Sequence, residues 1–151
     1  MTAPPITEFR GAYRFLSNFW PVGWADGRLT VEHYYQAAKA VSADDQRWVY
    51  DAPTPGEAKR RGRRVAVRSD WDDVKLEVMR TLVRAKFLTS VQLYGWLLAT
   101  GDAELVEGNT WHDNYWGRCS CDRCVRAEIV GQNHLGKILM QVRDELRERK
   151  S

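Results

Sequence analysis

The sequence has no long apolar run and only three cysteines among its 151 residues. No stretch approaches the roughly 18 apolar residues that a membrane-spanning helix needs, and residues 1–5 lack the basic and apolar regions of a signal peptide. We therefore expect a cytoplasmic protein with no membrane partner. The cysteines are then expected to be reduced thiols or metal ligands, because disulfide frameworks belong to oxidising compartments.

An excess of charge of one sign is also absent, because the net charge is only +3. This value is too small to imply nucleic-acid binding by itself. The hydrophobic fraction of 44% and the charged fraction of 28% are ordinary for globular proteins and argue against disordered, collagen-like and coiled-coil classes. The chain lacks internal repeats, low-complexity tracts and linkers. We therefore predict a single domain over residues 1–151, large enough to be stable without a disulfide or a metal.

Local signals predict a mostly helical α+β fold with a small N-terminal β-sheet. Residues 6–31 have the character of short strands and turns, with Asp26-Gly27 as a hairpin signal, and residues 104–107 are predicted as a further short strand. Apolar spacing and capping residues predict the helices. These run from Val31 to about Val41, over 43–50, from Pro55, over 71–88, over 91–99 and from His134 onward, with Thr30, Ser42, Thr54, Asp70, Ser90 and Asn133 as their caps.

Residues 110–132 are predicted to form a long irregular loop. A loop of this length is normally either functional or disordered. It holds all three cysteines and two of the seven tryptophans, Trp111 and Trp116. Because tryptophan in polar, turn-rich sequence is a candidate for stacking on a flat ligand ring, the composition favours function.

Four segments in order resemble one known family. They are residues 15–19 (FLSNF), 31–39 (VEHYYQAAK), 68–72 (RSDWD) followed by Lys75, and 111–117 (WHDNYWG) followed by 131–136 (GQNHLG). Their order and spacing resemble the NADAR superfamily of YbiA-like N-glycosidases, over roughly residues 9–143. The resemblance implies a compact α+β fold and cleavage of N-glycosidic bonds. The substrate classes it implies are ADP-ribose attached to guanine and early riboflavin-pathway intermediates with a ribose on an aminopyrimidine.

Cleavage of an N-glycosidic bond builds positive charge at the anomeric carbon, which a nearby carboxylate can stabilise, while an acid helps the base to leave. Glu32, Tyr35, Gln36 and Lys39 lie at i, i+3, i+4 and i+7 and share one helix face. That face either lines a pocket or is a solvated surface with a Glu-Lys pair, and Tyr34, Ala37, Ala38 and Val41 are predicted as the core face. The resemblance implies that Glu32 is catalytic.

Lys39 has two possible roles. A desolvated lysine can attack the aldehyde of a ring-opened ribose and form a Schiff base. The alternative is an ordinary surface or phosphate-pairing lysine.

Asp113 is the second candidate carboxylate, because the family pattern places a functional acid here. The alternative is a turn-forming Asp. Which of Glu32 and Asp113 is the acid and which is the base stays open. Trp71 is a stacking residue by resemblance or a packing residue at the start of a helix. Trp116 is the better stacking candidate of the loop, and Trp111 is expected to pack.

The remaining substrate-binding candidates are weaker. Asn18 either hydrogen-bonds a ribose or closes a turn, and Phe19 is its neighbour in the same motif. Asn133 and Gly136 begin the last helix, where a diphosphate could meet free N–H groups or where a neighbouring segment could pack closely. Arg64, in the basic stretch 59–68, either meets a nucleic-acid backbone or belongs to a solvated face.

The cysteines Cys119, Cys121 and Cys124 fall within six residues. Such a cluster can bind a structural zinc ion with a fourth ligand such as His112 or His134, or it can be three reduced thiols.

We therefore predict an N-glycosidase that removes ADP-ribose from guanine in a nucleotide or a nucleic acid and that requires no cofactor for catalysis. Hydrolysis of riboflavin-pathway ribosylaminopyrimidines is the alternative within the enzyme class. A non-catalytic ADP-ribose or NAD-binding module and a zinc-bearing interaction module are alternatives from other classes.

Overall fold

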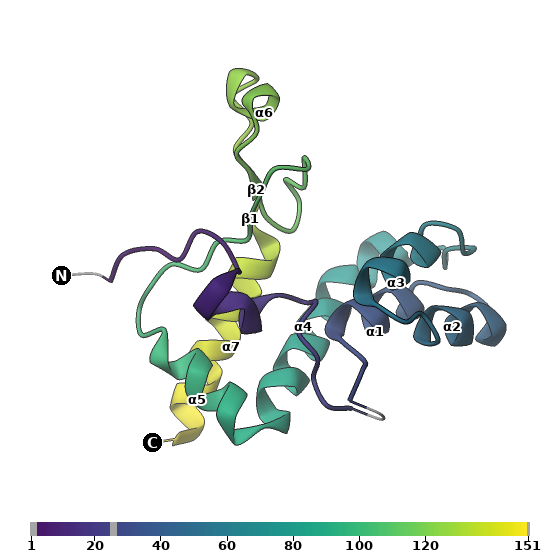
Figure 1. Ribbon diagram of the computed structural model, residues 1–151, viewed down its shortest axis with the longest axis horizontal. Helices are drawn as coiled ribbons and strands as arrows, with labels where there is room; N and C mark the ends of the chain where they lie inside the picture. Colours follow the sequence, from purple (N-terminus) through teal and green to yellow (C-terminus); the bar gives the residue numbers. More distant parts are fainter. Residues whose placement is uncertain (1–2, 25–26, 151) are drawn as a thin grey trace. The chain divides into compact units, whose positions relative to one another are not determined.

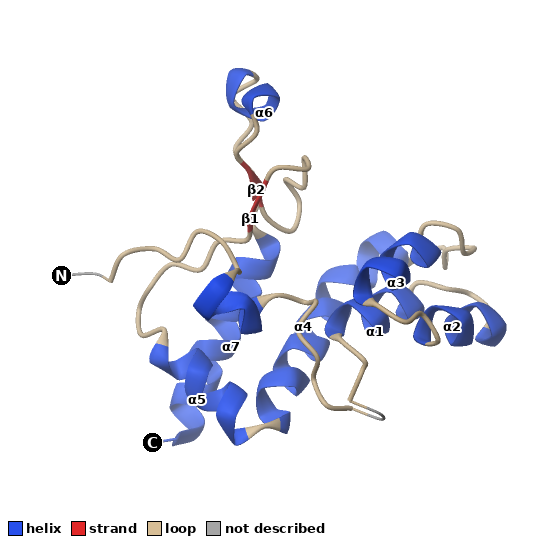
Figure 2. Cartoon of the chain, in the orientation of Figure 1, coloured by secondary structure: helices blue, strands red, loops and turns tan. Residues whose placement is uncertain are grey.

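The structure is a computed structural model that describes residues 3–24 and 27–150. The chain packs as two compact units, one formed by residues 18–89 and the other by residues 1–17 together with 90–151. Both are predominantly helical (Figures 1 and 2), which confirms the predicted mostly helical α+β class. In the described part of the chain, no helix is long and apolar enough to cross a membrane.

The described residues of the unit 18–89 form the helices α1 (Val31–Ala38), α2 (Ala43–Tyr50), α3 (Pro55–Gly62) and α4 (Trp71–Thr89). The predicted caps Thr30, Ser42 and Thr54 accept hydrogen bonds from the third residue of their helices. Helix α1 ends at Ala38, earlier than predicted, because Ala40 pairs with Val67 in an isolated bridge.

One core cluster of this unit consists of small side chains on and around α1, namely Ala37, Ala40, Val49, Ala52, Ala58 and Val65. The predicted core face of α1 is wrong in part. Val41 is 65% exposed, whereas the polar residues Glu32 and Gln36 are buried. The reason is that α1 contacts α2, α3 and α4, so that most of its circumference is covered. His33, with no exposed surface, completes the capping box with Thr30.

The second unit contains a 3-10 helix η1 (Gly11–Leu16), helices α5 (Val91–Ala99), α6 (Asp122–Arg126) and α7 (His134–Lys150), and strands β1 (Gly108–Asn109) and β2 (Arg118–Cys119). The strands pair in parallel, with Gly108 opposite Arg118. Ser90 caps α5 as predicted. The predicted apolar stripe of α7, from Leu135 to Leu146, is buried.

The predicted position of the sheet is wrong. It lies at residues 108–119, and the described N-terminal residues contribute only isolated bridges, Ile6 with Leu105 and Pro21 with Thr30. The predicted strand 104–107 is reduced to the bridge at Leu105, because Ile6 pairs with this segment at one point only. Asp26 of the hairpin signal lies outside the described residues.

The prediction that residues 110–132 form an irregular loop is also wrong, because this segment contains β2 and α6. Residues 108–130 form an arm that begins at β1 and β2 and carries helix α6 at its end (Figure 1). The backbone of Ser120 donates to Asn109 and that of Arg118 donates to Glu107. The two strands therefore form the base of this arm.

Candidate active site and cysteine cluster

The polar face of α1 is buried inside the unit of residues 18–89. Glu32 is 7% exposed and Gln36 is 6% exposed, and Gln36 Nε2 donates a 2.8 Å hydrogen bond to Glu32 Oε1. Burial of a carboxylate is costly unless it is hydrogen-bonded. The burial of this pair excludes the solvated-face interpretation for Glu32 and Gln36.

The oxygen of the Gln36 amide, Oε1, lies against Gly62 at the end of α3. A Cβ atom at Gly62 would lie 2.0 Å from Gln36 Oε1, so any larger residue would displace this side chain. Oε1 is buried, and no described residue donates a hydrogen bond to it. Unsatisfied buried oxygens are rare in native proteins, and this one offers an acceptor to a ligand or a water. Gly62 was not predicted as a site residue, because nothing in an arginine-rich helix end marks such a contact.

Lys39 follows α1 directly and continues the same face. It is half-buried, and burial lowers the pKa of its amine below the ordinary 10.5, with a smaller lowering from Arg63 and an opposing effect from Glu32. A lowered pKa leaves more of the amine neutral and nucleophilic. Its backbone carbonyl accepts from the backbone N–H of Arg68 at 2.9 Å, which fixes the residue where α1 ends.

Aromatic and amide side chains complete this region. The rings of Tyr35 and Trp71 lie 5.0 Å apart at 53°, and each is less than a tenth exposed, so Trp71 packs on Tyr35 at the start of α4. Asn18 is buried. Its carbonyl accepts from Glu32 N at 3.1 Å, and its Nδ2 lies 3.4 Å from Met79 Sδ. The structure therefore brings Asn18 to the beginning of α1, beside Glu32.

Two weaker candidates lie on the surface of this unit. Phe19 is 44% exposed. Arg64 is exposed and its guanidinium lies 5.4 Å from the centre of the Trp48 ring, on which Arg61 also lies. A separate apolar groove of about 380 Å³ between α1 and α4 is lined by Tyr34 and Ala38, among other residues, and not by Glu32.

Asp113 belongs to the other unit and has a defined structural role. Its Oδ1 accepts from the backbone N–H groups of Tyr115 at 3.2 Å and Trp116 at 2.9 Å. The side chain of Asn109 holds its backbone on both sides, accepting from Asp113 N at 3.1 Å and donating to Asp113 O at 2.8 Å. The turn-forming interpretation is therefore confirmed for one carboxylate oxygen. A catalytic role of Asp113 together with Glu32 stays a prediction.

One of the two loop tryptophans differs from the expectation. Trp116 lies in a ring cluster with Tyr115, 4.8 Å away, and His134. Trp111, which was expected to pack, is 53% exposed. After the turn at Asp113 the chain runs to the start of α7, where His134 N donates to Tyr115 O.

The start of α7 is occupied by protein groups. The backbone N–H groups of Asn133, His134 and Leu135 donate to the carbonyls of residues 117, 115 and 116. These amides are not free for a diphosphate, contrary to one of the two expectations. A Cβ at Gly136 would lie 2.0 Å from Leu105 O, and Asn133 Nδ2 donates to the same carbonyl at 2.9 Å. The close approach that Gly136 permits is therefore that of a neighbouring segment.

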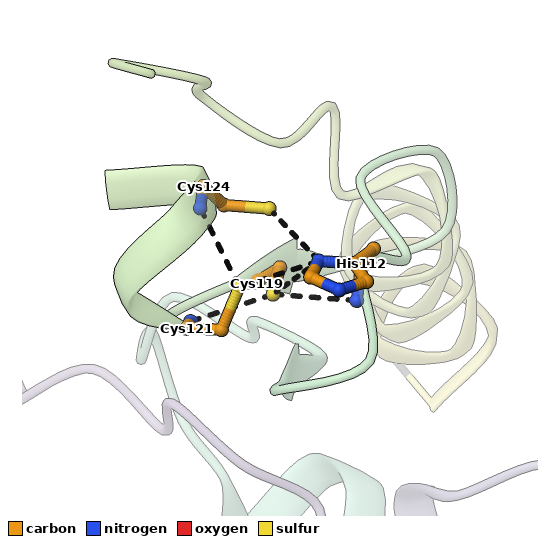
Figure 3. Close-up of side chains that lie close together, drawn as sticks. All are labelled: His112, Cys119, Cys121 and Cys124. Carbon is orange, nitrogen blue, oxygen red and sulfur yellow. Dashed lines mark hydrogen bonds between the residues drawn. The ribbon is translucent and has the colours of Figure 1, made fainter. Parts of the chain in front are cut away.

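The three cysteines and His112 converge on one point of the arm (Figure 3). Their ligand atoms all lie within 4.8 Å of one another. His112 Nδ1 is 3.3 Å from Cys121 Sγ, 3.4 Å from Cys124 Sγ and 4.0 Å from Cys119 Sγ. Of the two histidines considered for this cluster, the structure selects His112. His134 instead lies against Tyr115 and bonds Gln132.

Comparison with known proteins places these observations in a family. The NADAR domain model matches residues 8–147. The N-glycosidase Npun_R5314 of Nostoc punctiforme is 44% identical over 147 residues, covering 89% of this chain and 86% of that protein. The N-glycosidase YbiA of Escherichia coli is 38% identical over 140 residues, covering 89% and 82%. The riboflavin biosynthesis protein VVA0006 of Vibrio vulnificus is 40% identical over 144 residues, which cover 89% of this chain but 36% of that longer protein.

A solved structure agrees with the fold. The NMR structure of Escherichia coli YbiA matches with a TM-score of 0.80 and 36% identity, over 99% of this chain and 89% of that one. The resemblance drawn from the four motifs is thus confirmed, and so is the predicted enzyme class. The chain belongs to the NADAR domain family, and it is an N-glycosyl hydrolase.

Proposed function

We propose that this enzyme hydrolyses the N-glycosyl bond between guanine and the ribose of an attached ADP-ribose. Water enters at the anomeric carbon, and guanine and ADP-ribose leave. The observation that carries the proposal is the buried Glu32–Gln36 pair, continued along the same helix face by half-buried Lys39. A carboxylate held in the protein interior is suited to stabilise a cationic transition state, because a low local dielectric strengthens its field.

The candidate site residues have distinct roles in this proposal. Glu32 stabilises the charge at the anomeric carbon or activates the water, and Gln36 fixes the orientation of its carboxylate. Asp113, which belongs to the other unit, stays the predicted second carboxylate. The rings of Tyr35 and Trp71 shape the base site, and Asn18 contacts the ribose. Trp116, in the other unit, stays the predicted stacking residue of its loop.

The charge around Lys39 favours a substrate with phosphates. Arg63 is close enough to lower the pKa of Lys39, and Arg60, Arg63 and Arg64 are exposed on and beside α3. Guanidinium groups bind phosphate oxygens in a bidentate manner. The diphosphate of ADP-ribose, or the backbone of a modified nucleic acid, fits this cationic border.

A second substrate class has its own support. One relative is named a riboflavin biosynthesis protein, and a ribosylaminopyrimidine also joins a ribose to an amine-bearing ring. The same carboxylates would cleave it. The two substrates differ in the leaving base, which the ring pair Tyr35–Trp71 would contact.

A mass-spectrometric assay tests the proposal. The purified protein is incubated with a guanine-ADP-ribosylated oligonucleotide, with NAD and with a ribosylaminopyrimidine, in parallel. We expect the oligonucleotide to lose the mass of ADP-ribose and to regain unmodified guanine. Cleavage of the pyrimidine alone would assign the enzyme to the second class. Tight ADP-ribose binding without cleavage of any substrate would contradict both.

A further inference from the structure

The arm that carries α6 contains a set of ligands with no place in the glycosidase chemistry. We propose that His112, Cys119, Cys121 and Cys124 bind one structural zinc ion. The metal would tie α6 to the segment that contains Asp113.

The distances from His112 Nδ1 to the three sulfurs are close to those around a tetrahedral ion. Zinc–sulfur bonds of about 2.3 Å and zinc–nitrogen bonds of about 2.0–2.1 Å require nitrogen–sulfur separations of about 3.6 Å around a tetrahedron. The three separations from His112 Nδ1 are 3.3, 3.4 and 4.0 Å. All three cysteines are free thiols, so each sulfur is available as a ligand.

The surroundings of the sulfurs supply donors that thiolates need. Cys119 Sγ accepts from the backbone N–H groups of His112 at 3.3 Å and Cys121 at 3.4 Å. Cys121 Sγ accepts from Cys124 N, and Cys124 Sγ accepts from Asn114 Nδ2, both at 3.4 Å. Such outer hydrogen bonds orient metal ligands and offset their charge.

The backbone conformation of His112 also supports a metal site. Its φ is 70°, a left-handed conformation that residues other than glycine seldom adopt. This conformation directs both the N–H and Nδ1 of His112 toward the cysteine sulfurs.

The end of the arm has little apolar packing of its own. Helix α6 has five residues, and Cys124 is its buried residue. The apolar residues of this part of the arm face solvent, since Val125 is 61%, Ile129 is 48% and Val130 is 82% exposed. Helices this short are unstable without tertiary support, and small modules that lack an apolar core rely on disulfides or metals.

The donor set defines the kind of site. Four protein ligands fill a tetrahedral shell and leave no position for a reactive water, which is typical of structural rather than catalytic zinc. Binding releases the protons of the three thiols to solvent, and the resulting Zn(Cys)₃(His) centre has a net charge of −1. No electron transfer is involved.

Metal analysis of protein purified without chelators tests the proposal, and its result does not depend on the glycosidase substrate. We expect about one zinc per chain. His112→Ala and Cys124→Ser should lose the metal, while His134→Ala, the matched control, should keep it. Wild-type protein without zinc that also fails to take up added zinc would overturn the proposal, as would loss of zinc from the His134 variant but not from the His112 variant.

Two further measurements keep the test decisive if a variant folds poorly. Cobalt(II) added to metal-free wild-type protein should give the intense visible bands of a tetrahedral ion with thiolate charge transfer, and zinc should displace it. Chelation should accelerate tryptic cleavage after Arg118, Arg123 and Arg126 without changing cleavage in α7. Octahedral cobalt spectra, or cleavage that chelation does not alter, would contradict the proposal.

Discussion

Gln36 holds the carboxylate of Glu32 by a 2.8 Å hydrogen bond from Nε2 to Oε1, one helical turn apart on α1. Both side chains are buried. The bond therefore sets the orientation of the carboxylate in the interior of its unit, and it also fixes which end of the amide meets Gly62. A buried oxygen of Gln36 is left as an acceptor beside the candidate catalytic group.

Glu32→Gln should abolish most of the activity without unfolding the protein. The amide oxygen of the new side chain can still accept from Gln36, so the melting temperature should change little. Loss of a catalytic carboxylate should lower kcat by about 10²- to 10⁴-fold. Glu77→Gln, at a side chain that is 72% exposed on α4, is the control and should retain full activity. Wild-type turnover of the Glu32 variant would remove Glu32 from the mechanism.

Gly62→Ala, at the end of α3, should disturb the Glu32–Gln36 pair through Gln36. The added Cβ would lie 2.0 Å from Gln36 Oε1 and 3.0 Å from Gln36 Cβ, so Gln36 must move and release Glu32. We expect a loss of about 1–3 kcal/mol in the free energy of unfolding, as for other overpacked sites, together with a reduced kcat. Denaturant unfolding and the glycosidase assay measure the two effects.

Gly56→Ala is the matched control, because it lies in the same helix and its Cβ would meet nothing closer than 3.9 Å. It should be neutral or slightly stabilising, since alanine is favoured over glycine in helices. Equal effects of the two substitutions would show that the contact with Gln36 does not matter.

Local sequence signals predicted most of the unit of residues 18–89. Thr30, Ser42 and Thr54 each satisfy the backbone of the helix that follows, and such caps act within four residues, so they are readable from sequence. The burial of Glu32 was not predictable from periodicity, because it depends on three other helices packing around α1. The family motif was the signal that singled this residue out.

The arm was predicted less well for a physical reason. Strands β1 and β2 have two residues each and α6 has five, which is too short for periodicity to appear. The contacts that shape the arm are specific polar ones, such as those of Asn109 to Asp113. The closeness of the cysteines in sequence was readable, but the choice of His112 over His134 depended on the turn at Asp113.

Lys39 should form a covalent adduct that borohydride traps, if its amine attacks the ring-opened sugar. The amine and the aldehyde form an imine with loss of water, and reduction makes the bond permanent. Because burial lowers the pKa of Lys39 below 10.5, trapping should reach half of its maximum at a pH below that value. Intact mass measurement should find the adduct in wild-type protein and in Lys59→Arg, but not in Lys39→Arg. An adduct that survives in Lys39→Arg would assign the reaction to another lysine.

Lys86 should make stability depend on pH above neutrality. It is fully buried, next to the Phe87 ring, and burial lowers its pKa from 10.5 to about 7. Between these values the unfolded chain holds a proton that the folded chain lacks, so the free energy of unfolding rises with pH, by about 1.4 kcal/mol per pH unit from this group. Below pH 7 both states are protonated and the slope disappears.

Urea unfolding at several pH values measures this slope. Lys86→Met should remove the rise between pH 7 and 10, and Lys137→Met, at an exposed lysine of α7, is the control for loss of a charge. Parallel stability curves for wild-type protein and Lys86→Met would contradict the assignment.

Two substitutions of Asp113 can distinguish a structural role from a catalytic one. Its Oδ1 accepts hydrogen bonds from the N–H groups of Tyr115 and Trp116. Asp113→Asn keeps an oxygen that accepts these bonds, whereas Asp113→Ala removes it. If the carboxylate is catalytic, both variants should lose kcat by about 10²-fold or more, and only the alanine variant should lose stability, by about 1–3 kcal/mol for the unsatisfied amides. A side chain that only forms the turn predicts instead that Asp113→Asn retains wild-type turnover and that activity falls only where the melting temperature falls. Steady-state kinetics and thermal unfolding of the two variants therefore decide between the two roles of Asp113.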